Sequence, residues 1–182
     1  VVPELADGCL LTVLDDEGRP HDVGSWHVVP EARPVLERYA GVRLADLPPD
    51  APLMRALRNG ETVSFSAERA LETLPEGEAR RLLRSVRMGY GVTLPLQGHA
   101  RLVGGLTLLL NQTEAPTEQD LLTARQVADR IGRLPALGHR RAAGDRLNRQ
   151  ARQGRLHEAA PDGGGRRAAG HAAHGGVVVD RK

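Results

Sequence analysis

The stretch "GVTLPLQGHARLVGGLTLLL", residues 91–110, decides how the rest of the chain is interpreted. Two apolar runs flank a polar break that contains Gly98, and a glycine pair, Gly104–Gly105, lies inside the second run. A phosphate-binding loop of the P-loop type needs a lysine directly after its last glycine and a helix directly after the loop. His99 follows Gly98, and the next helical pattern begins only at Thr117. The mismatch argues against a nucleotide-binding loop.

The same stretch fits a β-hairpin whose turn is Gln97-Gly98-His99, with glycine supplying an unusual backbone angle. Apolar side chains alternate along both predicted strands: Val92, Leu94 and Leu96 on the first, and Leu106, Leu108 and Leu110 on the second, opposite to Thr107 and Leu109. A return strand that is apolar on both faces is typical of a central strand covered on both sides. The glycine pair permits close approach of a helix or a bend in the strand, and Pro95 predicts a bulge or an unpaired position.

Composition separates the chain into two parts. Residues 1–137 carry 15 Arg and 19 Asp or Glu, a net charge of −4, and hold the hydrophobic periodicity. Residues 138–182 carry 10 Arg or Lys and 4 acids, a net charge of +6, and contain the Gly/Ala/Arg-rich run "DGGGRRAAGHAAHGG". We expect this basic tail to be disordered, because it cannot bury enough apolar surface to offset its ordering entropy.

Other local patterns predict the remaining elements: strands at 9–14, 21–29 and 61–66, helical spacing at 30–40, and helices after Asp50 and at 76–87. Asp50 is the expected cap of the first of these helices, and Asn59-Gly60 its left-handed end. The last helix begins at Thr117, with Asp120 in the position of a capping box. Aspartate is shorter than the preferred glutamate, which leaves open a one-sided box. Pro135 should end or kink this helix.

This order of elements resembles a GAF domain, in particular those of actinobacterial multidomain signalling proteins linked to phosphatases or histidine kinases. The resemblance rests on "LADGCLLTVLDDEGR" at the start, Leu94-Pro95-Leu96, Gly105 to Leu108, and Thr117 to Leu121, and it covers residues 3–134. It implies an α+β (α/β) fold of the GAF/PAS-like type, with a central antiparallel sheet of five to six strands and helices on both faces. It also implies a GAF-like sensor domain at 1–137 whose first helix is mostly missing.

The resemblance further implies a small-molecule pocket between one sheet face and the middle helices. Trp26, Met54, Phe65 and Tyr90 are the candidate ligand-binding residues, and core packing is the competing interpretation for each. No cofactor is identifiable, and no metal site or catalytic residue is predicted. Cys9 starts an apolar strand, where a buried small hydrophobe is the default. A methionine-sulfoxide-reducing GAF enzyme would need further cysteines.

The resulting hypothesis is a cytoplasmic, non-catalytic regulatory domain that binds a small molecule or relays a signal. Its implied partners are a second copy, through the terminal helices, and a phosphatase or kinase output domain outside this chain. No apolar run approaches the ~20 residues needed to cross a membrane. A nucleic-acid-linked transcription or antitermination regulator is the alternative, although nucleic acid is not the favoured partner. A small-molecule enzyme is disfavoured, because no nucleophile and base can be paired.

Overall fold

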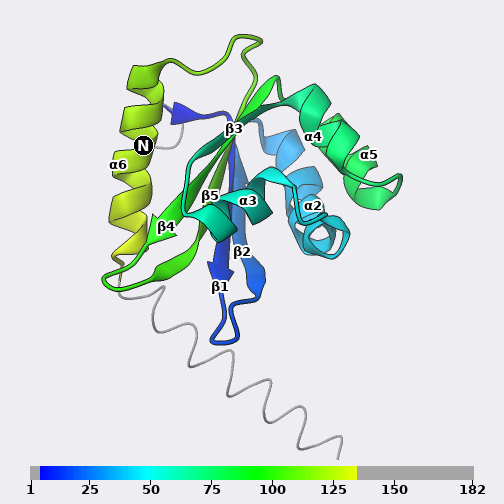
Figure 1. Ribbon diagram of the computed structural model, residues 1–182. Coiled ribbons are helices and arrows are strands. Elements are labelled where there is room, and N and C mark those ends of the chain that lie inside the picture. Colours follow the sequence, from blue (N-terminus) through cyan, green and yellow to red (C-terminus); the bar gives the residue numbers. More distant parts are fainter. Residues whose placement is uncertain (1–4, 135–182) are drawn as a thin grey trace, which may run out of the picture. The chain divides into compact units, whose positions relative to one another are not determined.

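The computed structural model describes residues 5–134, so the expectations for Pro135 and for residues 138–182 lie outside the described residues. Five strands form one antiparallel sheet in the order β2-β1-β5-β4-β3 (Figure 1). The strands are β1 (Gly8–Leu14), β2 (Pro20–His27), β3 (Val63–Ser66), β4 (Tyr90–Gln97) and β5 (Leu102–Leu110). The hairpin read from residues 91–110 is therefore present, and β5 is the central strand.

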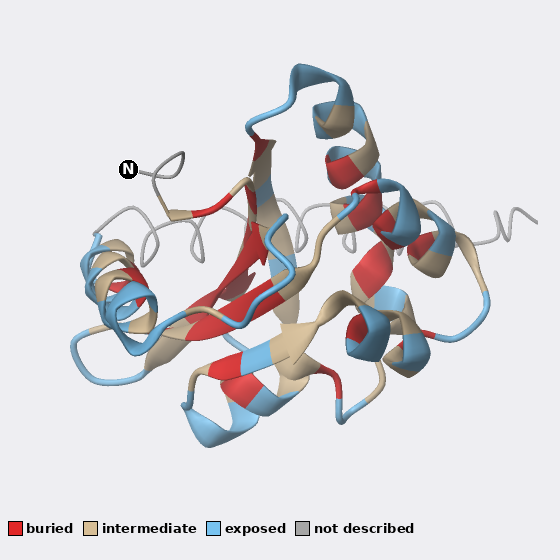
Figure 2. Cartoon of the chain, turned by 90° about the horizontal axis from the view of Figure 1, so that it is seen from above, coloured by how far each residue is buried: buried red, intermediate tan, exposed pale blue. Residues whose placement is uncertain are grey.

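Helices cover both faces of this sheet, as Figure 2 shows from above. They are η1 (Pro30–Ala32), α2 (Arg33–Asp46), α3 (Pro52–Asn59), α4 (Ala67–Thr73), α5 (Glu78–Ser85) and α6 (Glu118–Gly132). Helix α6 packs against β4 and β5 on one face, while α2, α3, α4 and α5 lie on the other. The expected α+β architecture, a central antiparallel sheet with helices on both faces, is confirmed.

The alternating side chains of β4 and β5 divide the core into two clusters. The α6 face holds an aliphatic cluster: Ala6, Val92, Leu94, Leu96, Leu106, Leu108, Ala124 and Ala128. The opposite face of the sheet, which carries the candidate site and is called the ligand face from here on, holds a second cluster: Leu10, Leu36, Tyr39, Ala70, Leu74, Ala79, Leu83, Val86 and Leu109. Thr107 and Leu109 thus face away from Leu106 and Leu108, as the alternation predicts.

The glycines of the central hairpin serve close packing. A Cβ at Gly105 would stand 2.9 Å from Leu53 Cδ1, so this glycine lets α3 approach the sheet. A Cβ at Gly104 would overlap the carbonyl oxygen of Thr12 on β1. The predicted reason for Gly98 is wrong, because Gly98 is not among the described glycines with positive φ. Glycine fits at this position because there is little room for a side chain: a Cβ there would lie 2.8 Å from Val103 Cγ1.

The N-cap of helix α3 lies one residue after the predicted cap, Asp50. Ala51 occupies the N-cap position, and no side chain caps this end of the helix, so the expected capping role of Asp50 is wrong. The cause is Pro52, whose fixed φ and missing N–H suit the first helical position. The predicted left-handed end is confirmed, because Gly60 has φ 70° and its N–H donates to the Ala56 carbonyl.

Two elements differ from the sequence pattern at their starts. Helix α4 was not predicted, and it begins where the Ser66 hydroxyl accepts from the Arg69 N–H. Helix α6 has a complete capping box instead of a one-sided one. The Asp120 carboxylate accepts from the Thr117 N–H at 3.0 Å, and the Thr117 hydroxyl accepts from the Asp120 N–H at 3.2 Å. The aspartate side chain is held within reach because the Thr117 hydroxyl also donates to Asp120 Oδ2, at 2.7 Å.

Pro95 lies in the part of β4 that extends past the end of its edge neighbour, β3. It is in register with Gly105 on β5, whereas the pairing of β3 with β4 ends at Val63 and Thr93. The missing N–H therefore leaves the β3–β4 ladder intact. The irregularity in the hairpin comes one residue later, between Leu96 and Gln97.

Candidate functional site

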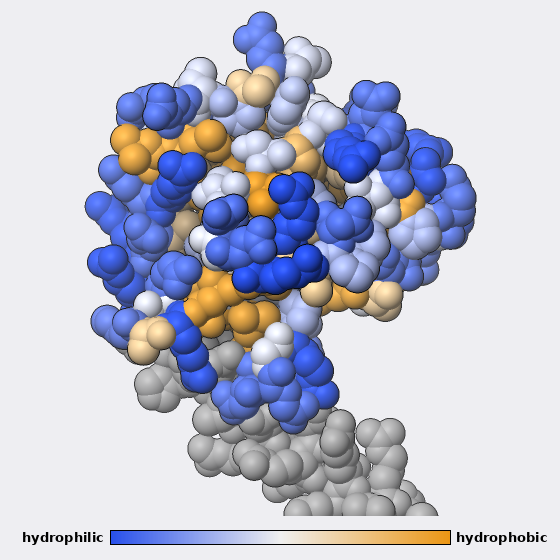
Figure 3. Space-filling model, in the orientation of Figure 1, coloured by the Kyte–Doolittle hydropathy of each residue, from blue (hydrophilic) through white to orange (hydrophobic). Residues whose placement is uncertain are grey.

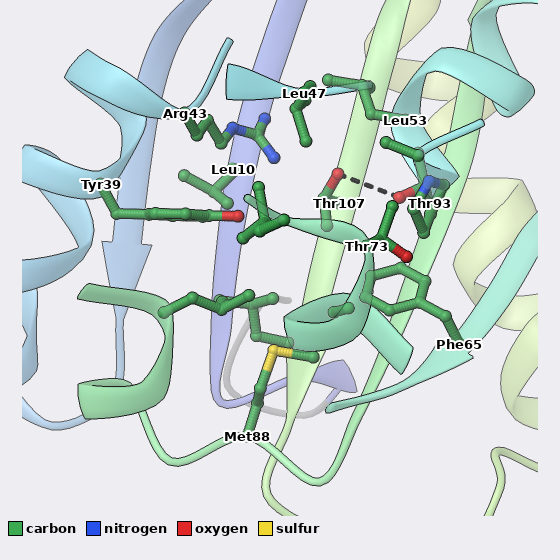
Figure 4. A pocket seen from close by; sticks show the side chains of 16 residues that line it. Leu10, Tyr39, Arg43, Leu47, Leu53, Phe65, Thr73, Met88, Thr93 and Thr107 are labelled. Carbon is green, nitrogen blue, oxygen red and sulfur yellow. Dashed lines mark hydrogen bonds between the residues drawn. The ribbon is translucent and has the colours of Figure 1, made fainter. Parts of the chain in front are cut away.

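A cavity of about 40 Å³ lies between the ligand face of the sheet and the four helices that cover it (Figure 4). Its wall is largely apolar, with leucines from β1, β5, α3 and α5. Five polar side chains interrupt this wall: Tyr39, Arg43, Thr73, Thr93 and Thr107. An apolar enclosure with a few convergent polar groups is the usual form of a small-molecule site.

The strongest polar feature is an ion pair between Arg43 on α2 and Asp22 on β2, with 4% and 5% of the two side chains exposed. Arg43 Nε donates to Asp22 Oδ2 at 2.6 Å, and Nη2 donates to Asp22 Oδ1 at 2.8 Å. Thr12 on β1 completes the group, because Arg43 Nη2 donates to its hydroxyl at 2.9 Å and that hydroxyl donates to Asp22 at 2.6 Å. Burial alone would lower the pKa of Arg43, but the hydrogen bonds and charge of Asp22 outweigh it and raise that pKa.

Tyr39 stands one helical turn before Arg43, on the same side of α2. Its ring is buried, and the guanidinium carbon of Arg43 lies 5.8 Å from the ring centroid. Figure 4 shows both side chains pointing toward the cavity. Burial raises the pKa of Tyr39, and the nearby charge of Arg43 offsets only part of that effect. The phenol is therefore a neutral hydroxyl at pH 7.

Two threonines form the floor of the cavity. Thr93 on β4 and Thr107 on β5 are cross-strand partners, and their hydroxyl oxygens are 3.1 Å apart. Both are buried among leucines. Thr73 differs, because its hydroxyl donates to the Arg69 carbonyl at 2.7 Å within α4.

A groove of about 350 Å³ lies beside the cavity, between α3 and the β3–α4 segment. Pro52, Phe65 and Thr73 line both the groove and the cavity, so these three side chains separate one from the other. Asp50, Arg55 and Arg69 make the outer part of the groove polar. The groove therefore adjoins the cavity across Pro52, Phe65 and Thr73.

The four predicted ligand-binding residues are not brought together. Phe65 lines the cavity, and its ring fills the space above Gly91 on β4. Met54 is half-buried on α3 outside the cavity lining. Trp26 lies on the edge strand β2, in register with Cys9 on β1. The guanidinium carbon of Arg33 lies over the Trp26 ring, 5.3 Å from its centroid.

Tyr90 begins β4 on the face of Val92 and Leu94, which is the α6 face. The role of all four residues in binding a ligand stays a prediction.

The sequence analysis did not identify Arg43, Asp22 or Thr12. One signal was available in α2, where Leu36, Tyr39 and Arg43 recur at helical spacing, so that an arginine falls on the buried stripe. The partner could not be inferred, because Asp22 lies on strand β2, 21 residues before Arg43, and β2 carries a bulge beside it.

Other chemistry-bearing residues give no second site in the described part of the chain. Cys9 is half-buried against the α6-face cluster, and burial raises the pKa of its thiol. Within residues 5–134, no three His, Cys, Asp or Glu side chains are placed to hold a metal ion. No helix in that range has the length and apolar content that membrane spanning requires. The surface in Figure 3 is mostly hydrophilic, with apolar side chains in separate small patches.

No protein-family model matches the chain, and no curated protein matches it. Several solved structures, in contrast, match this chain. The GAF domain of a phosphoenolpyruvate-protein phosphotransferase from Acinetobacter is 15% identical, with a TM-score of 0.51 over 77% of this chain and 76% of that one. The GAF domain of a two-component sensor histidine kinase from Bacillus halodurans is also 15% identical, with a TM-score of 0.50 over 70% of this chain and 79% of that one.

The second GAF domain of DevS from Mycobacterium smegmatis is 18% identical, covering 78% of this chain and 86% of that one, with a TM-score of 0.47. At such identities the two matches at 0.50 and 0.51 concern the fold alone. Residues 5–134 therefore have the α+β fold of GAF domains, with a largely apolar cavity that contains a few polar side chains beneath the middle helices.

Proposed function

We propose that residues 1–137 form a regulatory, non-catalytic sensory domain of the GAF type, which binds a small molecule or relays a signal within a bacterial signal-transduction protein. The observation that carries the proposal is the cavity, where polar groups from α2, β4 and β5 converge inside an apolar wall. The fold is shared with GAF domains of a sensor histidine kinase and of a phosphotransferase, which supports the same assignment.

We further propose that this domain acts in the cytoplasm of an actinobacterium, as a homodimer fused or docked to a phosphatase or kinase output domain. The composition supports the origin, because 24 of the 25 basic residues are arginines, with 21 Gly and 12 Pro, as in GC-rich genomes. The terminal helices are the proposed dimer contact, and α6 presents Leu122, 47% exposed, on its outer surface. The output domain would lie outside residues 1–182.

Native mass spectrometry of the purified full chain tests ligand binding directly. We expect a retained or added small molecule, released when the Arg43–Asp22 pair is replaced by Arg43→Met with Asp22→Leu. The same spectra report the oligomeric state, for which we expect a dimer. A chain that retains nothing from cell extract, and whose thermal unfolding is unmoved by a metabolite library, would count against the sensory assignment.

A further inference from the structure

We propose that the cavity beneath α2–α5 selects small, uncharged, mostly apolar molecules that carry a hydrogen-bond acceptor such as a carbonyl oxygen, held by Arg43 and Tyr39. This inference rests on the proposed function, because it names the class of molecule that the sensory site takes. Three properties of the cavity carry it: an excess of hydrogen-bond donors, a compensated charge, and a small volume beside a surface groove.

The donor excess follows from counting the N–H groups of Arg43. A guanidinium group has five N–H donors. One on Nε and two on Nη2 are used by Asp22 and Thr12. The remaining two are on Nη1, and Tyr39, which interacts with Arg43, can accept from one of them through its single oxygen. Among the described residues, one Nη1 N–H and the Tyr39 O–H therefore remain as donors beside the cavity.

The two threonines on the cavity floor add to this excess of hydrogen-bond donors over acceptors. Thr93 and Thr107 have two hydroxyl protons between them, and the hydrogen bond that joins them uses one. The second proton is another donor at a buried site. A buried donor without an acceptor costs about 1–3 kcal/mol. An occupant that supplies acceptors is therefore stabilised, and one that supplies further donors is not.

The charge of the site excludes ions. Arg43 is neutralised by Asp22, so the pair presents dipoles to the cavity and no net charge. A carboxylate or ammonium entering this apolar space would lose its hydration without finding a counter-charge, which costs several kcal/mol. A neutral carbonyl oxygen can accept from Nη1 or from Tyr39 without that penalty.

The volume limits the occupant to a few non-hydrogen atoms. The cavity measures about 40 Å³, and a single water needs about 10–15 Å³ on such a scale. Entry follows the α3–α4 groove past Phe65, whose ring is one of the three side chains between groove and cavity. Rotation of this ring would join the two spaces and lengthen the site for a larger apolar chain.

Amide chemical shifts of the isotope-labelled full chain test the proposal with three probes. Butanone has the neutral carbonyl, propanoate has the same number of non-hydrogen atoms but a charge, and xenon is apolar without an acceptor. We expect butanone to give saturable shifts at Thr107 and Leu109, and to bind at least about tenfold more tightly than propanoate at pH 7.

Variants separate hydrogen bonding from shape. Tyr39→Phe and Thr107→Val remove one hydroxyl each and keep the side-chain volume. Each should weaken butanone binding about three- to tenfold and leave xenon binding unchanged. Thr123→Val is the matched control, because the Thr123 hydroxyl donates to the Gln119 carbonyl on α6, away from the cavity. Thr123→Val should change the binding of neither butanone nor xenon.

Two results would overturn the ligand class while leaving the sensory proposal standing: propanoate binding as tightly as butanone, or butanone affinity unaffected by both hydroxyl deletions. If none of the three probes, xenon included, shifts the cavity amides of the folded chain, the ligand-binding form of the proposed function fails as well. Circular dichroism of each variant establishes that the fold is retained.

Discussion

The two faces of the sheet use the same strands for different purposes. On the α6 face, strands β4 and β5 pack leucines and a valine against Ala124 and Ala128, with the half-buried Cys9 beside them. On the ligand face, the same strands contribute Thr93 and Thr107 beneath a buried arginine–aspartate pair. Because side chains alternate along a strand, one sequence can build an aliphatic core on one face and a cavity with convergent polar groups on the other.

The contrast shows where stability and selectivity reside. Close-packed aliphatic contacts on the α6 face gain free energy from burial, about 25 cal/mol per Å² of apolar surface. Buried polar groups on the ligand face gain little net free energy, because desolvation offsets much of the attraction between them. Their value lies in discriminating among occupants. The predictions below alter one face at a time, in order of decreasing expected effect.

The largest effect should come from breaking the ion pair on the ligand face. Asp22→Ala leaves the Arg43 guanidinium buried without its counter-charge, and we expect the free energy of unfolding to fall by about 3–5 kcal/mol. Urea denaturation followed by circular dichroism measures the change. The control is Asp22→Leu with Arg43→Met, which replaces both partners by apolar groups and should recover most of the loss. A single variant that loses less than about 1 kcal/mol would mean that water reaches the pair.

The next prediction compares two leucines that are both fully buried. Leu94→Ala, on the α6 face, should lower the free energy of unfolding by about 2–5 kcal/mol, because it removes packed side-chain atoms from the aliphatic cluster and leaves a void there. Leu10→Ala, on the ligand face, enlarges the existing cavity.

Cyclopentanone, which is larger than butanone, measures the difference between these two variants in a thermal-shift titration. It should raise the melting temperature of the Leu10→Ala variant and leave that of Leu94→Ala unchanged. Equal stabilisation of both variants would contradict the division between the faces.

Glycines give a smaller and more local comparison. Gly104→Ala forces a Cβ against the Thr12 carbonyl, and backbone cannot move aside cheaply, so we expect a loss of about 1–3 kcal/mol. Gly105→Ala meets the flexible end of Leu53, 2.9 Å from the new Cβ, and should cost less. Unfolding of the two variants under the same conditions decides the order. If Gly105→Ala is the more damaging, α3 is held more rigidly on the sheet than its side-chain contact indicates.

Sequence patterns predicted the elements whose signals are local. Alternation along 91–110 identified the central hairpin and both of its faces, and Asn59-Gly60 marked the end of α3, because a left-handed residue is a local requirement. The start of α3 was misplaced because Asp50 and Pro52 are competing start signals two residues apart. Helix α4 was missed because its seven residues, Ala67–Thr73, show too few buried positions for a period to emerge.

The site was harder to predict than the fold for a physical reason. Large apolar residues were chosen as candidates, and only Phe65 reaches the cavity. Tyr90 and Trp26 are on strands, where one residue of register decides the face. The groups that define the cavity chemistry, Arg43 and Asp22, acquire their character only from each other across two elements. Helical spacing places Arg43 on the buried stripe of α2, but no pattern around Asp22 identifies it as the partner.

The smallest predicted effect concerns the α6 face alone. Thr117→Ala removes the hydroxyl that caps α6 and should cost about 0.5–2 kcal/mol, while butanone binding on the ligand face stays unchanged. Thr123→Ala, in the middle of the same helix, is the control and should cost less, because its hydroxyl makes no cap.

Acid provides a second measurement of the same cap. Hydrogen bonds from the Thr117 side chain and backbone hold the pKa of Asp120 below its ordinary value. A lowered folded-state pKa means that the carboxylate stabilises the fold above the unfolded value of about 3.9, and that this contribution is lost as the pH falls through the folded value. The stability difference between the unaltered chain and Asp120→Ala should therefore be full at pH 7 and shrink below about pH 4. A difference that is the same at both pH values would mean that the neutral carboxyl caps α6 equally well, and that the charge of Asp120 contributes nothing to the α6 face.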